Sequence, residues 1–324
     1  MRRRAAIGLA AVLTVGVSVG GAALGLNLVG KTTPTTKTKS RPPLSFQGDW
    51  EMDGEILGMP APILGQYDGA QCENTNVESA KDNETWNRGT LSVVSDIVGG
   101  GSKAARFDLP SDGLRLQACE ALHERTLGTG QGHPPLEQWY ALSIRFPANY
   151  TTSGWGLTLA QFNYEKIWGA PLSIIGQGPA DAGEPNQLRL VGQAGECVPV
   201  TEPNPHCEWS SGLGAPIGPW RIIPPERFAT EVWHDLLIHV VWSTKASEGL
   251  IEAFHRQRGG TWAQTVPRFT GKPTVQWRPG ETVKPTYPTL DKIGAYRGAN
   301  AAALSIWHDN FCVASTRAAA EACL

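Results

Sequence analysis

Glycine and proline interrupt this chain so often that few segments are long enough for a helix of several turns. There are 37 glycines and 24 prolines among 324 residues, about 19% of the chain against an average near 12%. Both residues break regular secondary structure, so long helices, coiled coils and helical repeats are disfavoured. From about residue 86 onward, the uninterrupted runs are short and alternate polar with apolar side chains. This period is typical of β strands, and the sequence therefore predicts an all-β fold.

The alternation is clearest in the segment 138–146. Tyr140, Leu142 and Ile144 fall on one face of an extended chain there, and Ser143 and Arg145 fall on the other. Such a segment buries its apolar face against a core. In the same way, residues 233–243 place an apolar face opposite a polar one.

Eleven segments have strand character, and no convincing long helix accompanies them. Two antiparallel sheets packed face to face, or a closed barrel, satisfy this pattern. One sheet of such a sandwich is commonly curved, and its concave outer face suits a long ligand. The three glycines at 99–101 lie between two of the segments and predict a hairpin turn. The predicted strands are 91–98, 103–109, 114–125, 138–146, 157–164, 171–177, 187–193, 233–243, 249–256, 292–298 and 304–314.

The amino terminus predicts export from the cytosol. Three arginines precede a long apolar run, so residues 1–30 are a signal peptide or a membrane anchor. Residues 31–45 are rich in Thr, Lys and Pro and predict a disordered linker. Residues 46–324 form one predicted β-sandwich domain, either secreted or anchored on the outer face of the membrane.

Six cysteines in an exported chain indicate disulfide bonds. We expect local pairing of Cys197 with Cys207 and of Cys312 with Cys323, which leaves Cys72 to pair with Cys119. No CxxC motif is present, so a zinc or thiol-redox site is not expected.

Charge and aromatic content indicate the kind of partner. The net charge is -2 and only 18% of residues are charged, so no basic field exists to bind nucleic acid. Tryptophan, with 12 residues, outnumbers phenylalanine and tyrosine, which fits stacking surfaces although most tryptophans belong to cores.

Polar side chains on three predicted strands are candidates for a site. His123 and Arg125 project together, which suits carboxylate recognition, unless Arg125 only forms a surface ion pair. Gln161 and Asn163 share a face, and such amides need either structural or substrate partners. Lys292, Gly294 and Tyr296 also share a face, although this pattern fits an edge strand as well. Motifs for zinc hydrolases, serine hydrolases and dinucleotide binding are absent.

An acidic segment near the linker offers an alternative chemistry. Glu51, Asp53 and Glu55 alternate, as the two carboxylates of a jelly-roll glycoside hydrolase do. Gly54 interrupts the strand pattern, however, and an exposed acidic segment is the favoured interpretation.

Taken in order, several stretches resemble the glucuronan lyase and heparin-lyase-I-like polysaccharide lyases. The resemblance spans about residues 90–315 and implies a concanavalin-like β-jelly roll with a concave substrate groove. It also implies cleavage of uronate-containing polysaccharides by β-elimination, and often a structural calcium ion. The stretches are SKAARFDLP (102–110), HERT (123–126), QWYALSIRFPANY (138–150), LAQFNY (159–164), EVWHDLLIHVVWS (231–243), GLIEAFHR (249–256), KIGAYRG (292–298) and LSIWHDNFCV (304–313).

By this resemblance the catalytic positions are His123, Gln161 and Tyr296. The implied substrate contacts are Arg125, Asn163, Lys292 and Arg297. Two features depart from the family pattern. Asn163 stands where relatives commonly have His, and residues 195–218 look like an insertion beside the groove.

β-Elimination assigns each group a role. Gln161, with Arg125 or Asn163, stabilises charge on the uronate carboxylate. His123 is the expected base for the C5 proton and Tyr296 the expected acid for O4. If Tyr296 performs both transfers, its pKa has to fall, through Arg297 or Lys292.

The sequence thus predicts an extracellular polysaccharide lyase acting on a glucuronan-like polymer. The alternatives are a non-catalytic carbohydrate-binding jelly roll or a glycoside hydrolase of similar fold. We expect an acidic polysaccharide as partner, a monomer, no organic cofactor and a structural calcium ion. Asp68, Glu73 and Asp309 are the candidate calcium ligands.

Overall fold

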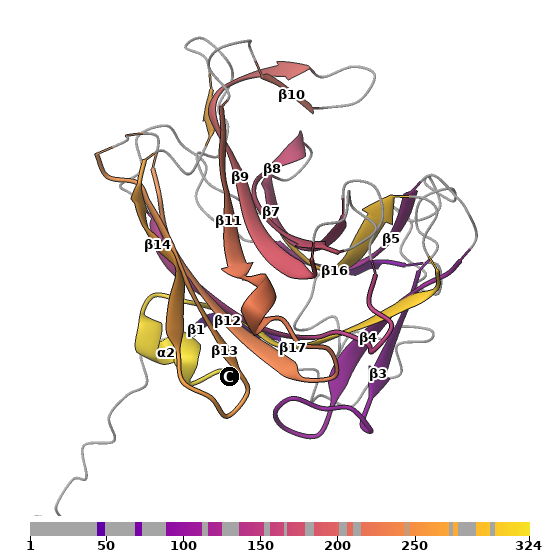
Figure 1. Ribbon diagram of the computed structural model, residues 1–324. Helices are drawn as coiled ribbons and strands as arrows, with labels where there is room; N and C mark the ends of the chain where they lie inside the picture. Colours follow the sequence, from indigo (N-terminus) through magenta and orange to yellow (C-terminus); the bar gives the residue numbers. More distant parts are fainter. Residues whose placement is uncertain are drawn as a thin grey trace, which may run out of the picture. The chain divides into compact units, whose positions relative to one another are not determined.

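The structure is a computed structural model whose described part is almost entirely β (Figure 1). It describes residues 44–48, 69–72, 89–111, 116–124, 136–151, 156–164, 167–178, 185–200, 206–209, 215–243, 245, 247–271, 275–277, 290–298 and 302–324. Among these residues the exceptions to strand and loop are a short 3-10 helix, η1 (Pro225–Arg227), and one α-helix, α2 (Arg317–Glu321). No described helix is long and apolar enough to cross a membrane.

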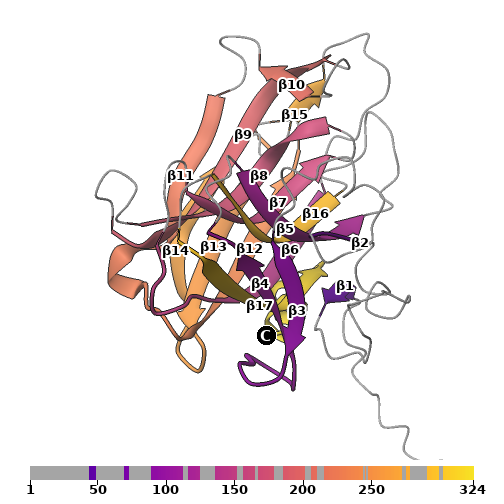
Figure 2. The same ribbon diagram turned by 90° about the vertical axis from the view of Figure 1, so that its right-hand side faces the viewer.

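Two sheets pack face to face, as Figures 1 and 2 show from two directions. The eight-stranded sheet has the order β14 (Ala263–Thr270), β13 (Leu250–Gln257), β12 (Trp233–Trp242), β6 (Leu136–Arg145), β17 (Leu304–Ala314), β4 (Ala104–Leu109) and β3 (Thr90–Val94), with β1 (Leu44–Gly48) also paired to β17. The nine-stranded sheet has the order β11 (Ala215–Ile223), β9 (Gln187–Val200), β10 (His206–Trp209), β8 (Ile167–Gln177), β7 (Leu157–Tyr164), β16 (Leu290–Gly298), β5 (Leu116–Glu124) and β2 (Gly69–Gln71), with β15 (Val275–Trp277) paired to β9.

The predicted two-sheet jelly roll is confirmed, and all eleven predicted strands are present. Their bounds agree within a few residues except at β9, which was predicted to end at 193 and extends to Val200. Pairing within the sheets is antiparallel except where β10 meets β8 and β15 meets β9. Two long strands were not predicted, β11 and β14, and both contain proline. Each lies at one edge of its sheet. Proline is tolerated there because the N–H group that it lacks is not needed for a hydrogen bond to a neighbouring strand.

The core lies between the sheets and follows the predicted alternation. Tyr140, Leu142 and Ile144 of β6 are buried in it, as expected, and so are Leu236 and Ile238 of β12. Burying such side chains stabilises the fold by roughly 1.5–3 kcal/mol each.

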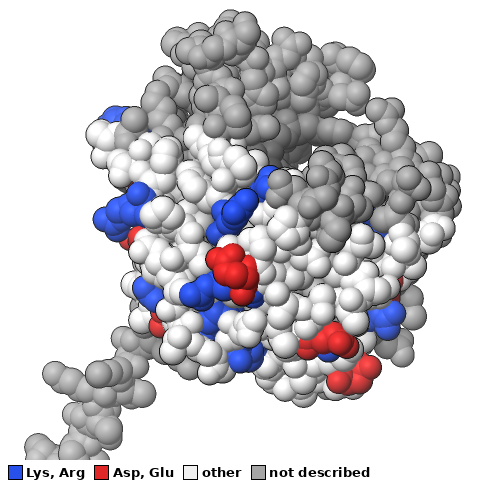
Figure 3. Space-filling model, in the orientation of Figure 1, with Lys and Arg blue, Asp and Glu red and all other residues white. Residues whose placement is uncertain are grey.

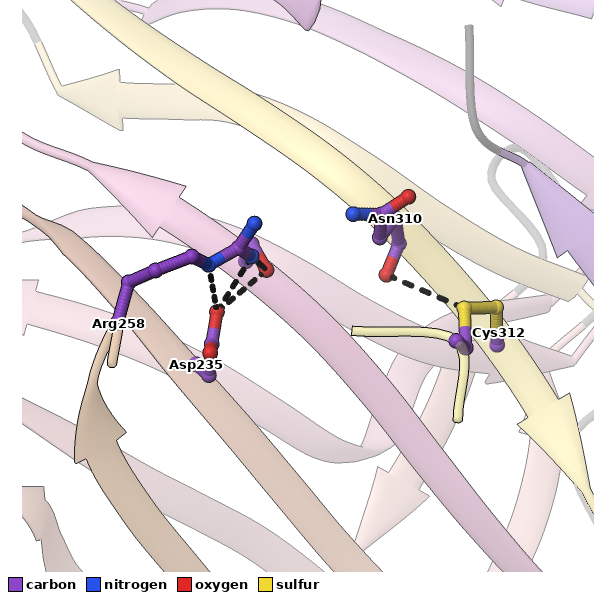
Figure 4. The surroundings of a disulfide bond; sticks show 6 residues. Asp235, Arg258, Asn310 and Cys312 are labelled. Carbon is purple, nitrogen blue, oxygen red and sulfur yellow. Dashed lines mark hydrogen bonds and ion pairs between the residues drawn. A yellow bond between two sulfur atoms is a disulfide. The ribbon is translucent and has the colours of Figure 1, made fainter. Parts of the chain in front are cut away.

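On the outer face of the eight-stranded sheet, charged and polar side chains of the protein pair with one another. Asp235 of β12 is fully buried there and accepts hydrogen bonds from Arg256 and Ser143. It also accepts one from Arg258, which Figure 4 shows beside it. A buried carboxylate is stable only when charged donors surround it in this way. This face is therefore occupied by the protein's own groups.

The carboxyl-terminal segment covers another part of the same face. Ala319 and Ala320 of α2 pack on Trp139 and Leu237, and the disulfide Cys312–Cys323 ties the segment to β17. The Cys323 sulfur lies 3.9 Å from the carbonyl oxygen of Asn310 (Figure 4).

Two of the three predicted disulfides are confirmed, Cys72–Cys119 and Cys312–Cys323. The side chains of Cys197 and Cys207 lie outside the description, so that pair stays a prediction. The segment 195–218 contains strand pairing between β9 and β10. The predicted leader (1–30) and the acidic segment 51–55 lie outside the described residues. Most of the linker (31–45) does so too, but β1 begins at Leu44, inside its predicted bounds.

Burial of neutral histidines makes the stability depend on pH. Burial lowers the pKa of His255 to about 3, helped by His234 and Arg227, and it lowers the pKa of His308 to about 3. The pKa of His234 is lowered by the same cause. These groups bind protons in the unfolded chain below about pH 6.5 but not in the folded chain. Burial raises the pKa of Asp309 to about 6. This carboxyl therefore binds a proton more readily in the folded chain, which offsets the destabilisation caused by one of the histidines as the pH falls.

We therefore expect the free energy of unfolding to fall as the pH decreases from about 6.5. Each histidine contributes up to about 1.4 kcal/mol per pH unit, since its proton is bound only after unfolding. Urea unfolding between pH 7 and pH 5 measures this dependence. A midpoint that is constant or rises over this range would contradict the buried neutral state of these imidazoles.

The two disulfides should differ in their contribution to stability. Cys72–Cys119 spans a sequence separation of 47 and Cys312–Cys323 one of 11. Because the longer closed loop restricts the unfolded chain more, replacing the first pair by alanines should cost about 1 kcal/mol more than replacing the second. Guanidinium unfolding of the two double variants tests this, and a larger loss for the shorter loop would argue against it.

Candidate active site

Strands β5, β16 and β7 are neighbours, and their register decides which polar side chains share a face. Lys292 on β16 lies directly opposite Gln161 on β7 and Leu122 on β5. Residues opposite each other in an antiparallel pair project to the same side of the sheet. Lys292 and Gln161 therefore stand together on the outer face of the nine-stranded sheet, since the alternate residues Ile293 and Ala160 are in the core.

Tyr296 lies on the same outer face. It pairs with Ala118 on β5 and Thr158 on β7, and Gly294 separates it from Lys292 along β16. A Cβ atom at Gly294 would lie 2.2 Å from the carbonyl oxygen of Cys119, so only glycine allows β16 to approach β5 here. The predicted shared face of Lys292, Gly294 and Tyr296 is confirmed.

A hydrogen bond between two amides orients Gln161. Asn163 Nδ2 donates to Gln161 Oε1 at 2.9 Å, so the Gln161 Nε2 hydrogens remain as donors toward a ligand. Asn163 is 8% exposed, and its Oδ1 atom has no hydrogen-bond partner among the described residues. Since a buried amide oxygen is costly to leave unpaired, it is a ready acceptor for a ligand hydroxyl.

Glu120 is the functional candidate that sequence reasoning missed. It pairs with Gly294, is 4% exposed, and its Oε2 atom lies 3.6 Å from Lys292 Nζ. The signal was available, because residues 119, 121 and 123 share one face of β5 and leave 120 on the other.

The site keeps Tyr296 protonated. Burial raises the pKa of Tyr296, and the negative charge of Glu120 raises it further. The expectation that this pKa falls, which accompanied a phenol acting as both base and acid, is wrong for this structure. A neutral phenol on this face is instead a proton donor.

His123 projects to the opposite side of the sheet. It pairs with Asp291, whose other neighbour Phe162 is in the core. Its Nδ1 atom lies 3.3 Å from Asp291 Oδ2, and Asp291 is completely buried. The disulfide at Cys119 and the buried Ala121 fix this face inward. The expected convergence of His123 with Gln161 and Tyr296 is therefore wrong.

Arg297 also departs from its expected position. It is 2% exposed and its Nη2 atom donates to the carbonyl oxygen of Pro110 at 3.0 Å. Because it follows Tyr296 directly on β16, it faces inward and cannot contact substrate on the outer face. Arg125 lies outside the described residues.

Asp309 is held by backbone amides. Gly99 and Gly100 donate to its Oδ2 atom, at 3.0 and 2.5 Å. A Cβ atom on Gly99 would lie 2.6 Å from that oxygen, so the contact requires glycine. No group of three His, Cys, Asp or Glu side chains that could hold a metal occurs in the described part of the chain. Asp68 and Glu73 lie outside it, and the calcium site stays a prediction.

The sheet that carries the site is curved. Strands β7, β8 and β9 bend along their length, with the outer face on the inside of the bend (Figure 1). In the view of Figure 3, the described charged side chains lie in small groups among uncharged residues, as the net charge of -2 suggests. We call the outer surface the concave face; it carries Glu120, Leu122, Gln161, Asn163, Ser173, Ile175, Arg189, Val191, Arg221, Lys292 and Tyr296.

The chain is similar to solved structures of two lyases. An endo-β-1,4-glucuronan lyase from the fungus Trichoderma reesei superposes with a TM-score of 0.50 at 17% identity, over 85% of this chain and 96% of that one. A PL-14 alginate lyase from Aplysia kurodai superposes with a TM-score of 0.48 at 11% identity, over 85% of this chain and all (100%) of that one. No curated protein sequence matches the chain.

The sequence itself matches one family over most of its length. Residues 64–312 fit the family described as polysaccharide lyase. This range contains both sheets except β1, together with Gln161, Lys292 and Tyr296. The chain belongs to the polysaccharide lyase family.

Proposed function

We propose that the protein is an extracellular lyase that cleaves a uronate-containing, glucuronan-like polysaccharide by β-elimination on the concave face. The observation that carries the proposal is the register of β16 against β7 and β5. It places the Lys292 ammonium opposite the Gln161 amide and the Tyr296 phenol two positions beyond Gly294.

These groups match what the reaction needs at the uronate carboxylate. Removal of the C5 proton leaves an electron pair that is shared with the adjacent carboxylate, and that charge has to be stabilised. The Gln161 Nε2 hydrogens and the Lys292 ammonium supply donors and positive charge. Asn163 holds the Gln161 amide in the orientation that presents these donors.

The two proton transfers then complete the elimination. A base takes the C5 proton, the C5–H electron pair forms the C4=C5 double bond, and the C4–O4 bond breaks. Tyr296 gives its proton to O4, in agreement with its raised pKa. For the base we propose Glu120, the carboxylate described on this face next to Lys292. Water is not consumed, and one product carries an unsaturated uronate end.

Two further observations support the substrate and the location. The glucuronan lyase of similar fold acts on a β-1,4-linked polyuronate, as its name states. Two disulfides, Cys72–Cys119 and Cys312–Cys323, are typical of proteins in an oxidising compartment. Both fit an enzyme that meets an acidic polysaccharide outside the cell.

Substitution at Tyr296 and Gln161 tests the elimination site. With glucuronan as substrate, Tyr296→Phe removes the proton donor and should lower kcat by about 10²–10⁴-fold. Gln161→Ala removes a charge-stabilising donor and should cost about 10²–10³-fold. The ultraviolet absorbance of unsaturated ends measures both rates, and unfolding midpoints should stay near that of the wild type.

Matched controls keep this test specific. Tyr150→Phe removes a phenolic hydroxyl from a core residue, and Gln264→Ala removes an exposed amide from β14 of the other sheet. Both should keep full turnover. Wild-type protein that releases reducing ends without absorbance would indicate hydrolysis, and binding without any product would indicate a carbohydrate-binding module.

Glu120→Gln separates a base from a purely electrostatic group. If the carboxylate accepts the C5 proton, the variant should lose at least about 10²-fold in kcat at every pH. If Glu120 only raises the pKa of Tyr296, turnover should persist and its alkaline limb should move to lower pH. The pH–rate profile of the variant decides between the two roles.

A further inference from the structure

The strand register of the nine-stranded sheet places further residues in line with the reacting residues of the proposed site. A single row of directly paired residues starts at Tyr296 on β16 and passes through Thr158 on β7 and Ile175 on β8. It continues to Arg189 on β9 and ends at Arg221 on β11. Paired residues project to the same side, so the whole row lies on the concave face.

Both arginines are placed to meet a ligand. Leu188 and Leu190, which flank Arg189, are fully buried in the core, so Arg189 points outward and is half-buried. Arg221 is exposed, and its side chain makes no hydrogen bond or ion pair with the residues that the structure describes. Two guanidinium groups directly opposite each other on one face can donate hydrogen bonds to one anion from both sides.

The row also has the direction that a bound polysaccharide would take. Because β7, β8 and β9 bend in the same sense (Figure 1), the axis of their curvature crosses the strands, as the row does. With strands about 4.8 Å apart, Arg189 lies about 14 Å and Arg221 about 19 Å from Tyr296. One sugar of an extended 1,4-linked chain advances by about one strand spacing, so these distances correspond to the third and fourth sugars from the reacting bond.

We infer that Arg189 and Arg221 form a remote subsite that binds uronate carboxylates three to four sugars from the cleavage point. The inference rests on the proposed elimination site at Tyr296. In the row, Ile175 lies between Tyr296 and Arg189 and offers an apolar surface to the sugar chain. Planar guanidinium groups bind carboxylates through paired hydrogen bonds. The enzyme therefore prefers long polyuronate chains over short ones.

The test compares substrates that do and do not reach the subsite. The double variant Arg189→Gln/Arg221→Gln should lose at least about tenfold in kcat/KM on a glucuronate octamer, since each charge-assisted contact is lost. It should keep the wild-type value on a trimer. Arg268→Gln, which removes the same charge from β14 of the other sheet, should leave both values unchanged.

Direct binding keeps this test independent of catalysis. Titration calorimetry should show the octamer binding more weakly to the double variant than to the wild type. It should also show a smaller dependence of that affinity on salt, because fewer charges are paired. A neutral β-1,4-glucan octamer should bind the two proteins equally.

Equal losses on trimer and octamer, or no loss on the octamer in both assays, would overturn the subsite. Absence of unsaturated product from every polyuronate would instead refute the elimination site. In that case the calorimetric comparison of octamer with neutral glucan still decides the role of the two arginines. A melting temperature of the double variant at or above that of the wild type excludes misfolding as the cause of any loss.

Discussion

A hydrogen bond through the core connects the two sheets at the strand that carries the candidate site. His308 of β17 donates from Nε2 to the carbonyl oxygen of Gly294 on β16, at 2.9 Å. The imidazole is completely buried, and this burial lowers its pKa to about 3, so it stays neutral and keeps the proton on Nε2. Gly294 lies between Lys292 and Tyr296, and the eight-stranded sheet therefore holds the middle of the reactive strand in place.

The outer faces of the two sheets differ in how their polar side chains are paired. On the eight-stranded sheet, polar side chains pair with one another, as Asp235 does with Arg256 and Arg258, and α2 covers the part near Trp139 and Leu237. On the nine-stranded sheet, Asn163 Oδ1 has no partner within the described residues. The same sandwich thus has one face whose polar side chains pair with one another and one face equipped for a ligand.

The two-sheet fold followed from the sequence because period-two alternation is clear in strands such as β6 and β12, whose alternate residues lie in the core. The prediction missed β11 and β14, where prolines interrupt the pattern and an edge position tolerates them. The same rule gave the shared faces of Gln161 with Asn163 and of Lys292 with Tyr296. Alternation also implies that Arg297 points away from Tyr296, so its proposed substrate contact conflicted with the pattern itself.

His123 shows what alternation alone does not provide. The rule places His123 with Cys119 and Ala121, but it does not say which face of β5 is buried. In the structure, the Cys72–Cys119 disulfide and Ala121 lie in the core, so the imidazole projects inward and Glu120 projects to the concave face.

The reactive strand is not central in its sheet. Beyond β16 lie β5 and β2 on one side, whereas β7, β8, β9 and β11 lie on the other. A polysaccharide cut above β16 would therefore be held by unequal lengths of protein. If elimination occurs there, the fragment above β7, β8, β9 and β11 would cross more of the described strands than the fragment above β5 and β2. The two new ends of the polymer would then leave the protein at different rates.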